Sequence, residues 1–594
     1  MKKTMKKTMK NMLSMAAAVL TATIMTACAG SDDTFADPPQ QPENQSKTIT
    51  LTTTVGLCGA NGGATTRALT SGGVKTFAEG DRMAVIYKNT SGQTVKAVSE
   101  ALKAEDITTT GEPLTDKKNA TFTVTLDDPD SNAPIRYIYP AAMAKENVAT
   151  DAAIDDAGTV DLTNLNAQDG TIGSLGSALD LCTYDAANWT SGELPVGATL
   201  ANQLAVLAVT VKDAGGAYDI TSGIKGLTVS DGTNSYTVTR EAAEGPIYVA
   251  MLPTANADIT VTATDGLINY EKTLADKKTY EASNFYNVGW RMMPTKTTPL
   301  TMEALTGGTI RVFDPQYGMK YSKNGGAKAA VTSDAISVSA GDKVHFYGDG
   351  TSITCYEGTS IAGGTADVKV YGNIMSLVNE TGYATATTLP ANYTFMFLFE
   401  GNDKLKDASS LLLPATTLAK ECYGRMFSGC RSLETAPALP ATTLAESCYY
   451  SMFYGCTSLT AAPALPATTL AYECYFGMFD GCTSLTTAPA LPATKLADYC
   501  YYNMFSGCSS LTAAPALPAE TLAESCYQYM FDGCTKLNAV TCLAYDIRAT
   551  DCTTNWLYNA GTAVTGTKTF TTPSLTNWST GPSGIPEGWT RVDY

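Results

Sequence analysis

The sequence predicts a multidomain protein in which an all-β sandwich region and a small β domain precede a C-terminal right-handed βα solenoid. Three observations predict this organisation. A unit of 26 residues recurs five times near the C-terminus, alternating apolar and polar stretches dominate the preceding part, and the first residues have the pattern of a processing signal. At 594 residues the chain is long enough for several domains.

The repeat region has the clearest pattern in the chain. Its unit reads LPATTLAxxCYxxMFxGCTSLTxAPA, and one proline and two cysteines recur in every copy. They are Pro414, Pro440, Pro466, Pro492 and Pro518, with Cys422, Cys448, Cys474, Cys500 and Cys526, and Cys430, Cys456, Cys482, Cys508 and Cys534. A degenerate earlier copy starts at Pro390 and has Asn402 in place of the second cysteine. An atypical first unit is typical of the end of a solenoid.

Each unit predicts one helix and one short strand. Two apolar stripes with a spacing of four residues run side by side in the second copy: Leu444, Cys448 and Met452, and Ala445, Tyr449 and Phe453. They predict a helix with one buried face. Thr443 and Glu446 fit a capping box, and Gly455 stands where that helix would end. Residues Ser458–Ala462 predict a strand that the following prolines keep short.

The rest of the chain predicts β domains around this solenoid. Alternating runs such as Thr121–Leu126, Leu204–Val211 and Ile259–Ala263, separated by polar turns, predict a sandwich region. A Gly341-Asp342 turn before the strand Lys343–Tyr347 predicts a smaller β domain. We expect sandwich lobes at 48–165 and 166–297, the small β domain at 298–388, the solenoid at 389–541, and a cap at 542–594 that covers the last repeat.

The N-terminus has the pattern of a secretory signal over residues 1–27. Five lysines precede a short apolar run that ends at Met25. The sequence Met25-Thr26-Ala27-Cys28 resembles the bacterial lipobox, a resemblance which implies that Cys28 becomes a lipid-carrying N-terminus in the outer membrane. The following acidic cluster resembles the surface-export signal of Bacteroidetes lipoproteins, or it is simply a solvated linker. Residues 28–47 are polar and rich in proline and glutamine, so we expect a flexible tether.

Two resemblances extend this assignment. The core CYxxMFxGCxSL resembles the BspA-like leucine-rich-repeat proteins of Bacteroidetes surfaces over about residues 389–541, and the tail resembles their closing segment. This resemblance implies a surface role, often adhesion. The runs Phe77–Tyr87, Tyr137–Pro140 and Ile247–Ala250 resemble the fimbrillin family, which implies two β-sandwich lobes. Fimbrillin-type subunits are matured by cleavage after an arginine, so Arg67 is a candidate cleavage site; the alternative is a surface arginine in a loop.

Composition argues against several functional classes. The net charge is −17, whereas nucleic-acid binding needs basic patches. A single histidine, His345, excludes HExxH zinc sites, and we expect it to be structural. The sequence has no GxSxG motif, P-loop or GxGxxG motif. We therefore expect no enzyme activity, no cofactor and no metal site.

The chain has 16 cysteines without a CxxC pair, which argues against zinc ribbons and thioredoxin-like chemistry. Export permits disulfides, but the repeat cysteines also stand at predicted core positions. Asn402 replaces one of them in the first copy, and this favours free, buried thiols.

A candidate ligand site follows from comparing the copies with one another. The tyrosine column Tyr423, Tyr449, Tyr475, Tyr501 and Tyr527 is invariant and predicted to be core. The next column varies and is rich in aromatic residues, and other variable positions nearby add more of them. The candidate residues are Tyr450, Phe476, Tyr502, Tyr454, Tyr472, Tyr499 and Tyr529. Exposed aromatic residues are frequent in interaction sites; the alternative is that they fill the space between neighbouring repeats.

The function expected from these observations is an adhesin that engages host or bacterial surface partners, protein or glycan, through its repeats. Two alternatives stay open. One is a tip or accessory subunit of a fimbria, which would contact fimbrial subunits. The other is a surface polysaccharide-binding protein.

Overall fold

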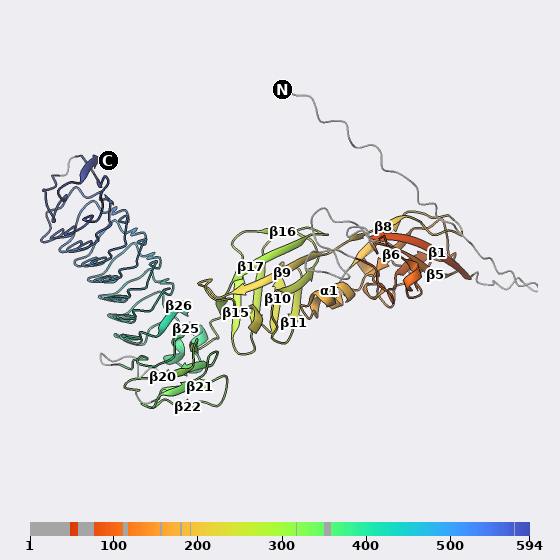
Figure 1. Cartoon of the computed structure of the whole chain (residues 1–594), viewed down its shortest axis with the longest axis horizontal. Helices are drawn as coiled ribbons and strands as arrows, with labels where there is room; N and C mark the ends of the chain where they lie inside the picture. Colours follow the sequence, from red (N-terminus) through yellow and green to blue (C-terminus); the bar gives the residue numbers. More distant parts are fainter. Residues whose placement is uncertain are drawn as a thin grey trace, which may run out of the picture. The chain divides into compact units, whose positions relative to one another are not determined.

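The computed structural model describes residues 48–57, 76–110, 117–154, 157–178, 181–190, 192–315, 318–349, 358–574 and 577–594. These residues form a mostly β, multidomain structure with several sheets, as the sequence predicts (Figure 1). They divide into two compact units. One comprises the described parts of Met1–Ala208 with Tyr248–Asn256 and Lys278–Tyr286, and the other comprises Val209–Ile247, Ala257–Lys277 and the described parts of Asn287–Tyr594.

Helical structure is scarce in the described part of the chain. Its one α-helix is α1 (Ile172–Ala178), and short 3-10 turns account for the rest. No helix within the described ranges combines the length and the apolar character needed to span a bilayer.

The first unit contains an eight-stranded sheet in the order β3-β2-β6-β7-β8-β1-β5-β4. Its strands are β1 (Thr48–Leu57), β2 (Ala84–Lys88), β3 (Thr94–Val98), β4 (Ile107–Thr108), β5 (Asn119–Asp127), β6 (Ile135–Tyr139), β7 (Cys182–Ala186) and β8 (Ala198–Asn202). Strand β1 lies between β8, to which it is parallel, and β5, to which it is antiparallel. Alternate residues of β5 are buried, because one face of an antiparallel strand covers the core. The core includes Phe77, whose ring packs edge-on against Phe122 and Tyr139.

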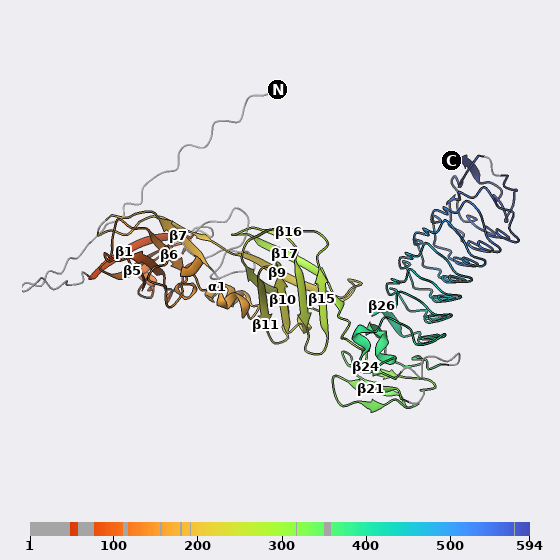
Figure 2. The same ribbon diagram turned by 180° about the vertical axis from the view of Figure 1, so that it is seen from behind.

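Three further sheets follow along the chain, and Figure 2 shows several of their strands. The five-stranded sheet has the order β11-β10-β14-β15-β18, the three-stranded sheet β12-β9-β17, and β13 pairs with β16. The strands are β9 (Ala205–Lys212), β10 (Gly226–Ser230), β11 (Ser235–Thr239), β12 (Ile247–Met251), β13 (Thr254–Ala257), β14 (Thr260–Thr264), β15 (Asn269–Thr273), β16 (Lys278–Tyr280), β17 (Phe285–Arg291) and β18 (Met293–Pro294). Strands β5, β9 and β14 coincide with the three alternating runs predicted from the sequence.

A six-stranded sheet of order β22-β21-β24-β19-β25-β26 leads into the repeats. Its strands are β19 (Leu300–Ala304), β21 (Lys320–Lys323), β22 (Ala329–Ala330), β24 (Lys343–Tyr347), β25 (Val368–Asn373) and β26 (Leu405–Leu412), and beside them β20 (Gly308–Ile310) pairs with β23 (Ile336–Val338). Strand β26 runs parallel to β25. One hydrophobic core therefore continues from Leu300 through the repeats to Trp589.

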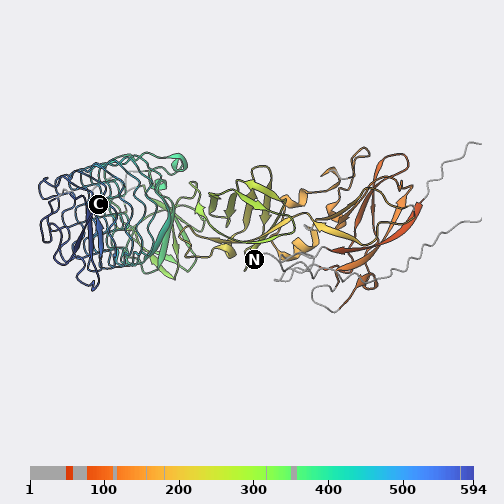
Figure 3. The same cartoon turned by 90° about the horizontal axis from the view of Figure 1, so that it is seen from above.

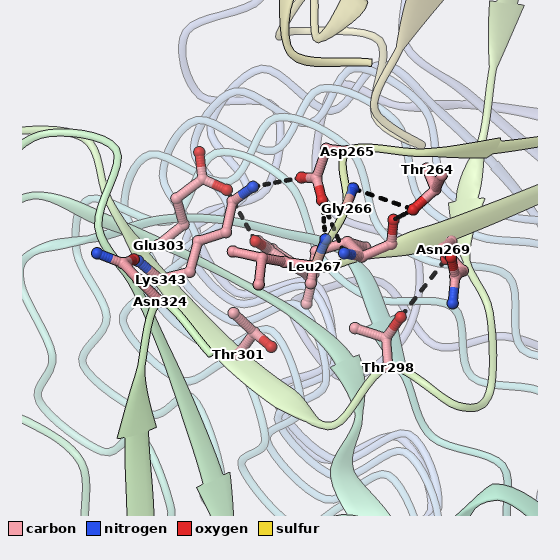
Figure 4. A network of polar contacts seen from close by, with 12 residues as sticks. Thr264, Asp265, Gly266, Leu267, Asn269, Thr298, Thr301, Glu303, Asn324 and Lys343 are labelled. Carbon is pink, nitrogen blue, oxygen red and sulfur yellow. Dashed lines mark hydrogen bonds and ion pairs between the residues drawn. The ribbon is translucent and has the colours of Figure 1, made fainter. Parts of the chain in front are cut away.

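The same unit contains a buried ion pair between the hairpin turn after β14 and the start of β24 (Figure 4). The Lys343 ammonium contacts the Asp265 carboxylate, and only 17% and 10% of their side chains are exposed. Asp265 also accepts hydrogen bonds from the N–H groups of Leu267 and Ile268, at 2.8 and 2.7 Å. Burial acts to raise the pKa of Asp265, but these hydrogen bonds and the Lys343 charge outweigh it and lower that pKa.

The helix predicted in each repeat is wrong. Residues 446–454 of the second copy form consecutive turns in which Ser447 and Ser451 have positive φ, at 52° and 47°. The N–H groups of alternate residues donate within their own turn, as Tyr450 does to Ser447 O at 3.1 Å. The N–H groups between them donate to the next repeat, as Ser451 does to Phe476 O at 2.8 Å. The stripes repeat every four residues, and consecutive turns fit that period as well as a helix does.

The strand predicted at Ser458–Ala462 is reduced to a single parallel bridge, between Ala461 and Thr487. A second bridge, between Thr443 and Thr469, lies where the sequence predicted the start of the helix. Successive copies nevertheless lie side by side, because backbone hydrogen bonds join the turns of each copy to those of the next. Figure 3 shows the copies in this arrangement from above. At the C-terminal end, β27 (Ala539–Thr541), β28 (Thr569–Thr572) and β29 (Thr590–Asp593) form a parallel sheet.

Both ends of the stack are closed by residues that copy its internal contacts. Between repeats, each second-column thiol donates to a phenylalanine carbonyl of the preceding copy, as Cys456 Sγ does to Phe427 O at 3.1 Å. Asn402 stands at this position in the first copy and donates through Nδ2 to Ile361 O at 2.9 Å. At the other end, Trp556 stacks on Tyr527 with ring centroids 6.0 Å apart.

Candidate functional site

The invariant aromatic columns are buried, as predicted for the core. The tyrosine column is about 1% exposed and the phenylalanine column is fully buried. Within each column neighbouring rings stack: Tyr449 and Tyr475 have centroids 5.8 Å apart, and Phe453 and Phe479 5.6 Å apart. These columns hold the repeats together and are closed to a ligand.

The variable columns occupy the outer side of the same turns. Because the turns repeat every four residues, the first, fifth and ninth residues of the turns in a copy share one orientation. In the second to fifth copies none of these residues is buried, whereas in the first copy Gly424 and Ser428 are. We call these twelve positions in four repeats the outward face. It consists of Glu446, Tyr450 and Tyr454; Tyr472, Phe476 and Asp480; Asp498, Tyr502 and Ser506; and Glu524, Gln528 and Asp532.

Three of the predicted ligand-binding residues form a stack on this face. The ring of Phe476 lies between those of Tyr450 and Tyr502, with centroid distances of 5.1 and 4.5 Å. All three side chains are half-buried. The rings therefore do fill space between neighbouring repeats, and they present their edges outward while their faces contact one another.

Three more predicted residues surround this stack. Tyr472 packs edge-on against Tyr499 at 5.7 Å, Tyr499 lies 5.9 Å from Tyr502, and Tyr529 packs edge-on against Tyr502 at 5.8 Å. The seventh, Tyr454, lies on the outward face and is 48% exposed, and Tyr472 is 44% exposed. The structure thus gathers six of the seven rings into one contacting set, with the seventh on the same face.

Carboxylates stand among these rings, and the sequence analysis missed them. Glu473 accepts a hydrogen bond from Ser447 Oγ at 3.0 Å, and Glu524 accepts one from the Tyr499 hydroxyl at 3.3 Å. Comparing the copies with one another could have found these carboxylates. Acidic residues recur at the twelve outward positions, and lysine and arginine do not occur there.

The pKa values of three residues on this face are raised, chiefly by burial or by a hydrogen bond. Burial raises the pKa of Asp480 to about 6, and the Asp532 charge adds to the effect against a hydrogen bond from Ser506. Burial also raises the pKa of Asp532. The pKa of Tyr472 is raised chiefly by its hydrogen bond to Glu473.

The thirteen cysteines that the structure describes are all free and buried, in line with the expected thiols. Burial raises the pKa of each repeat thiol, to about 12 for Cys422 and Cys474. Thiols in this state are poor nucleophiles and poor metal ligands.

His345 lies in β24 with only 4% of its surface exposed, in the structural position that we expected. Its Nδ1 lies 2.8 Å from the Thr301 hydroxyl, and burial with the nearby Lys343 charge lowers its pKa to about 4. Across the described ranges, no three His, Cys, Asp or Glu side chains gather in a way that could hold a metal ion.

Two predicted processing residues, Cys28 and Arg67, lie outside the described residues, as do the predicted signal and tether. The strand that precedes Arg67 along the chain is described: it is β1, and its Leu51, Val55 and Leu57 are buried in the core of the first unit.

No family model and no curated protein matches this chain. Among solved structures, it is similar to a candidate cell adhesion protein from Bacteroides fragilis NCTC 9343, with 12% identity, a TM-score of 0.23, and coverage of 40% of this chain and 91% of that one. It is also similar to a candidate cell adhesion protein from Bacteroides uniformis ATCC 8492, with 14% identity, a TM-score of 0.22, and coverage of 41% and 96%.

Proposed function

We propose that this chain is a lipid-anchored, non-enzymatic binding protein of the bacterial outer surface, and that it acts as an adhesin. In this proposal the 26-residue copies form one continuous solenoid that presents the outward face to a host or bacterial surface partner. The observation that carries it is the contrast between two aromatic columns of the same turns. One is invariant and buried, whereas the other varies from copy to copy and stays partly exposed.

The arrangement of the two columns supports a binding role because the fold needs only the first. Exposed apolar side chains that gather into a patch usually mark an interaction site. Tyr454 and Tyr472 keep 48% and 44% of their surface exposed. Other copies have serine at the position of Tyr454 (Ser428 and Ser506) and a carboxylate at the position of Tyr472 (Glu446 and Asp498), so the repeat does not need an aromatic residue at either.

The test replaces the exposed rings and spares the stacked ones. We expect Tyr454→Ser with Tyr472→Ser to reduce attachment of protein-coated beads to host and bacterial cells, with a change in melting temperature below about 2 °C because little packing is lost. Tyr545→Ser with Tyr558→Ser, at 58% and 49% exposure outside this face, is the matched control. Unchanged attachment by the first variant would contradict the proposal. The triple variant at Tyr450, Phe476 and Tyr502 is less suitable, since those rings pack on each other.

A second candidate function, a tip or accessory subunit of a fimbria, is favoured by the position of β1. Cleavage after Arg67 would separate β1 from the rest of the chain, although β1 lies inside the eight-stranded sheet between β8 and β5. Its loss would uncover a groove that another strand could fill. Mass spectrometry of surface polymers should then find a mature N-terminus at Ala68. Only chains that retain β1 in such polymers would contradict this candidate.

A further inference from the structure

We propose that the outward face binds a cationic segment of a partner protein, one rich in lysine and arginine. This inference rests on the proposed function and names the partner chemistry of the same face. Two independent features carry it: the charge of the face and the way its rings are packed.

The charge on the outward face has a single sign. Five of its twelve positions are carboxylates, five are aromatic, and the others are Ser506 and Gln528. Residues 446–535 contain seven acidic residues and one basic residue, Lys495, which is not on this face. The face ends where the preceding copy places Lys420, and that ammonium binds the Glu446 carboxylate at 2.8 Å. None of the twelve positions of the outward face is a lysine or an arginine, so this ion pair with Lys420 is the one neutralising contact described for the face.

The resulting field acts on the carboxylates themselves. Burial is the main cause of the raised pKa of Asp480, and repulsion from the Asp532 charge, two repeats further on, adds to it. A cationic side chain placed there would relieve this repulsion, so the face has a stronger attraction for ammonium and guanidinium groups than its individual carboxylates would have.

The packing of the central ring leaves no aromatic face there on which a sugar could stack. A sugar ring needs an open aromatic face to stack on, but the faces of Phe476 are covered by Tyr450 and Tyr502 at 5.1 and 4.5 Å. The exposed edges still offer an apolar surface. The aliphatic stem of a lysine or arginine can pack on it while the charged end reaches a carboxylate such as Glu524 or Asp498.

The experiment measures binding of a defined probe to the full-length protein. The probe is a fluorescent peptide in which Lys and Arg alternate with Ser and Gly, and its control has Gln at every cationic position. We expect the cationic peptide to bind, the Gln peptide to bind at least about tenfold more weakly, and the cationic binding to fall as salt is raised, because screening weakens exposed ion pairs.

A charge-only variant locates the site. Asp498→Asn, Glu524→Gln and Asp532→Asn together keep the shape of the face and its hydrogen-bond acceptors while removing three charges, and we expect about tenfold weaker peptide binding. The matched control, Glu79→Gln, Glu146→Gln and Asp151→Asn, removes three exposed charges from the first unit and should change binding less than about twofold.

Three outcomes would overturn the inference: no binding of the cationic peptide, equal weakening by both charge variants, or binding of a neutral polysaccharide such as mannan that the Tyr454 and Tyr472 variant abolishes. Failure here is distinguishable from failure of the proposed function. If the aromatic variant loses cell attachment and the charge variant keeps it, the face is a binding site for a partner that is not cationic. If neither variant affects attachment, the adhesin proposal fails as well.

Discussion

Burial on the outward face raises the pKa of the Asp480 carboxyl to about 6. A carboxyl whose pKa is higher in the folded chain than in the unfolded chain destabilises the fold once it ionises. Its cost is absent below about pH 4 and grows as the pH rises to about 6.

We therefore predict that Asp480→Asn stabilises the protein at pH 7, by roughly 1 kcal/mol after allowance for its partial exposure. The same substitution should have little effect at pH 4, where both states bind the proton. Thermal melts at the two pH values measure this difference. Asp498→Asn, at an exposed position of the same face, should leave the stability unchanged at both; an equal gain there would point to a general charge effect.

At the scale of the element, the turns of the repeats depend on residues that adopt positive φ. Each copy has three such positions with a spacing of four residues. The third is always glycine, as at Gly481 with φ 74°, while the second is serine, asparagine, arginine, tyrosine or glycine, as at Gly477 with φ 57°. A non-glycine residue in this region costs about 1 kcal/mol or more, and asparagine tolerates it best.

We predict that Gly481→Ala lowers the free energy of unfolding by about 1–2 kcal/mol. A Cβ there would lie 3.6 Å from Gly455 of the preceding copy, which is an ordinary van der Waals distance, so the cost comes from the backbone conformation. Gly477→Asn is the control, because Asn503 already adopts this conformation with φ 54° in the next copy. The Ser451 hydroxyl, 3.1 Å from the added Cβ, has to shift slightly to make room for it. Denaturant titration measures both. Equal losses of unfolding free energy in the two variants would mean that replacing a glycine in these turns is destabilising whatever conformation the new residue tolerates.

The buried ion pair between Asp265 and Lys343 should contribute to the stability of the fold. Lys343→Ala should destabilise the fold by about 3 kcal/mol, because it leaves a buried carboxylate without its cation. Since the pKa of Asp265 is lowered in the folded state, the stabilisation is present at neutral pH and lost as the pH falls below about 4. Lys277→Ala, which breaks an exposed pair with Asp258 at 2.9 Å, should cost less than about 1 kcal/mol. Chemical denaturation at pH 7 and pH 3 compares the two variants.

How far the sequence predicts an element depends on what sets its periodicity. Strands β5, β9, β14 and β24 follow from alternation, because a two-residue period has one structural interpretation. The four-residue stripes of the repeats are ambiguous between a helix and consecutive turns. Positive φ at Ser447 and Ser451 resolves this ambiguity, but serine gives no signal of that conformation. The invariant core columns were predicted correctly because burial depends on the stripe and not on the backbone that produces it.

At the scale of the whole molecule, the sequence predicts which residues belong to the candidate site but not how their side chains pack. Aromatic residues at variable positions stand out in a comparison of copies. The stacking of Phe476 between Tyr450 and Tyr502 does not, because it depends on the distance between adjacent turns. The role of Asn402 was equally hidden: only its contact with Ile361 O explains why this copy has an amide where the others have a thiol.

The proposed lipid anchor at Cys28 would determine where the entire chain is located. If Cys28 carries lipid, Cys28→Ala should shift the protein from the outer-membrane fraction to the soluble fraction or leave its signal unprocessed. The physical reason is that several acyl chains hold a protein stably in a bilayer, whereas a polar tether has no affinity for it. Cell fractionation and intact mass measure the change. A Cys28→Ala protein with the original mass and the same membrane fraction would contradict the proposed anchor.

The contacts between copies would allow the number of copies in such a chain to change. Alternate N–H groups of a copy are satisfied only by the following copy, and Asn402 and Trp556 close the two ends with separate contacts. An interior copy therefore meets equivalent neighbours on both sides wherever it stands. Recombination between the nearly identical coding segments could add or remove whole units of 26 residues without disturbing either end. The length of the repeat region would then vary in discrete steps, and each added unit would bring its own set of outward residues.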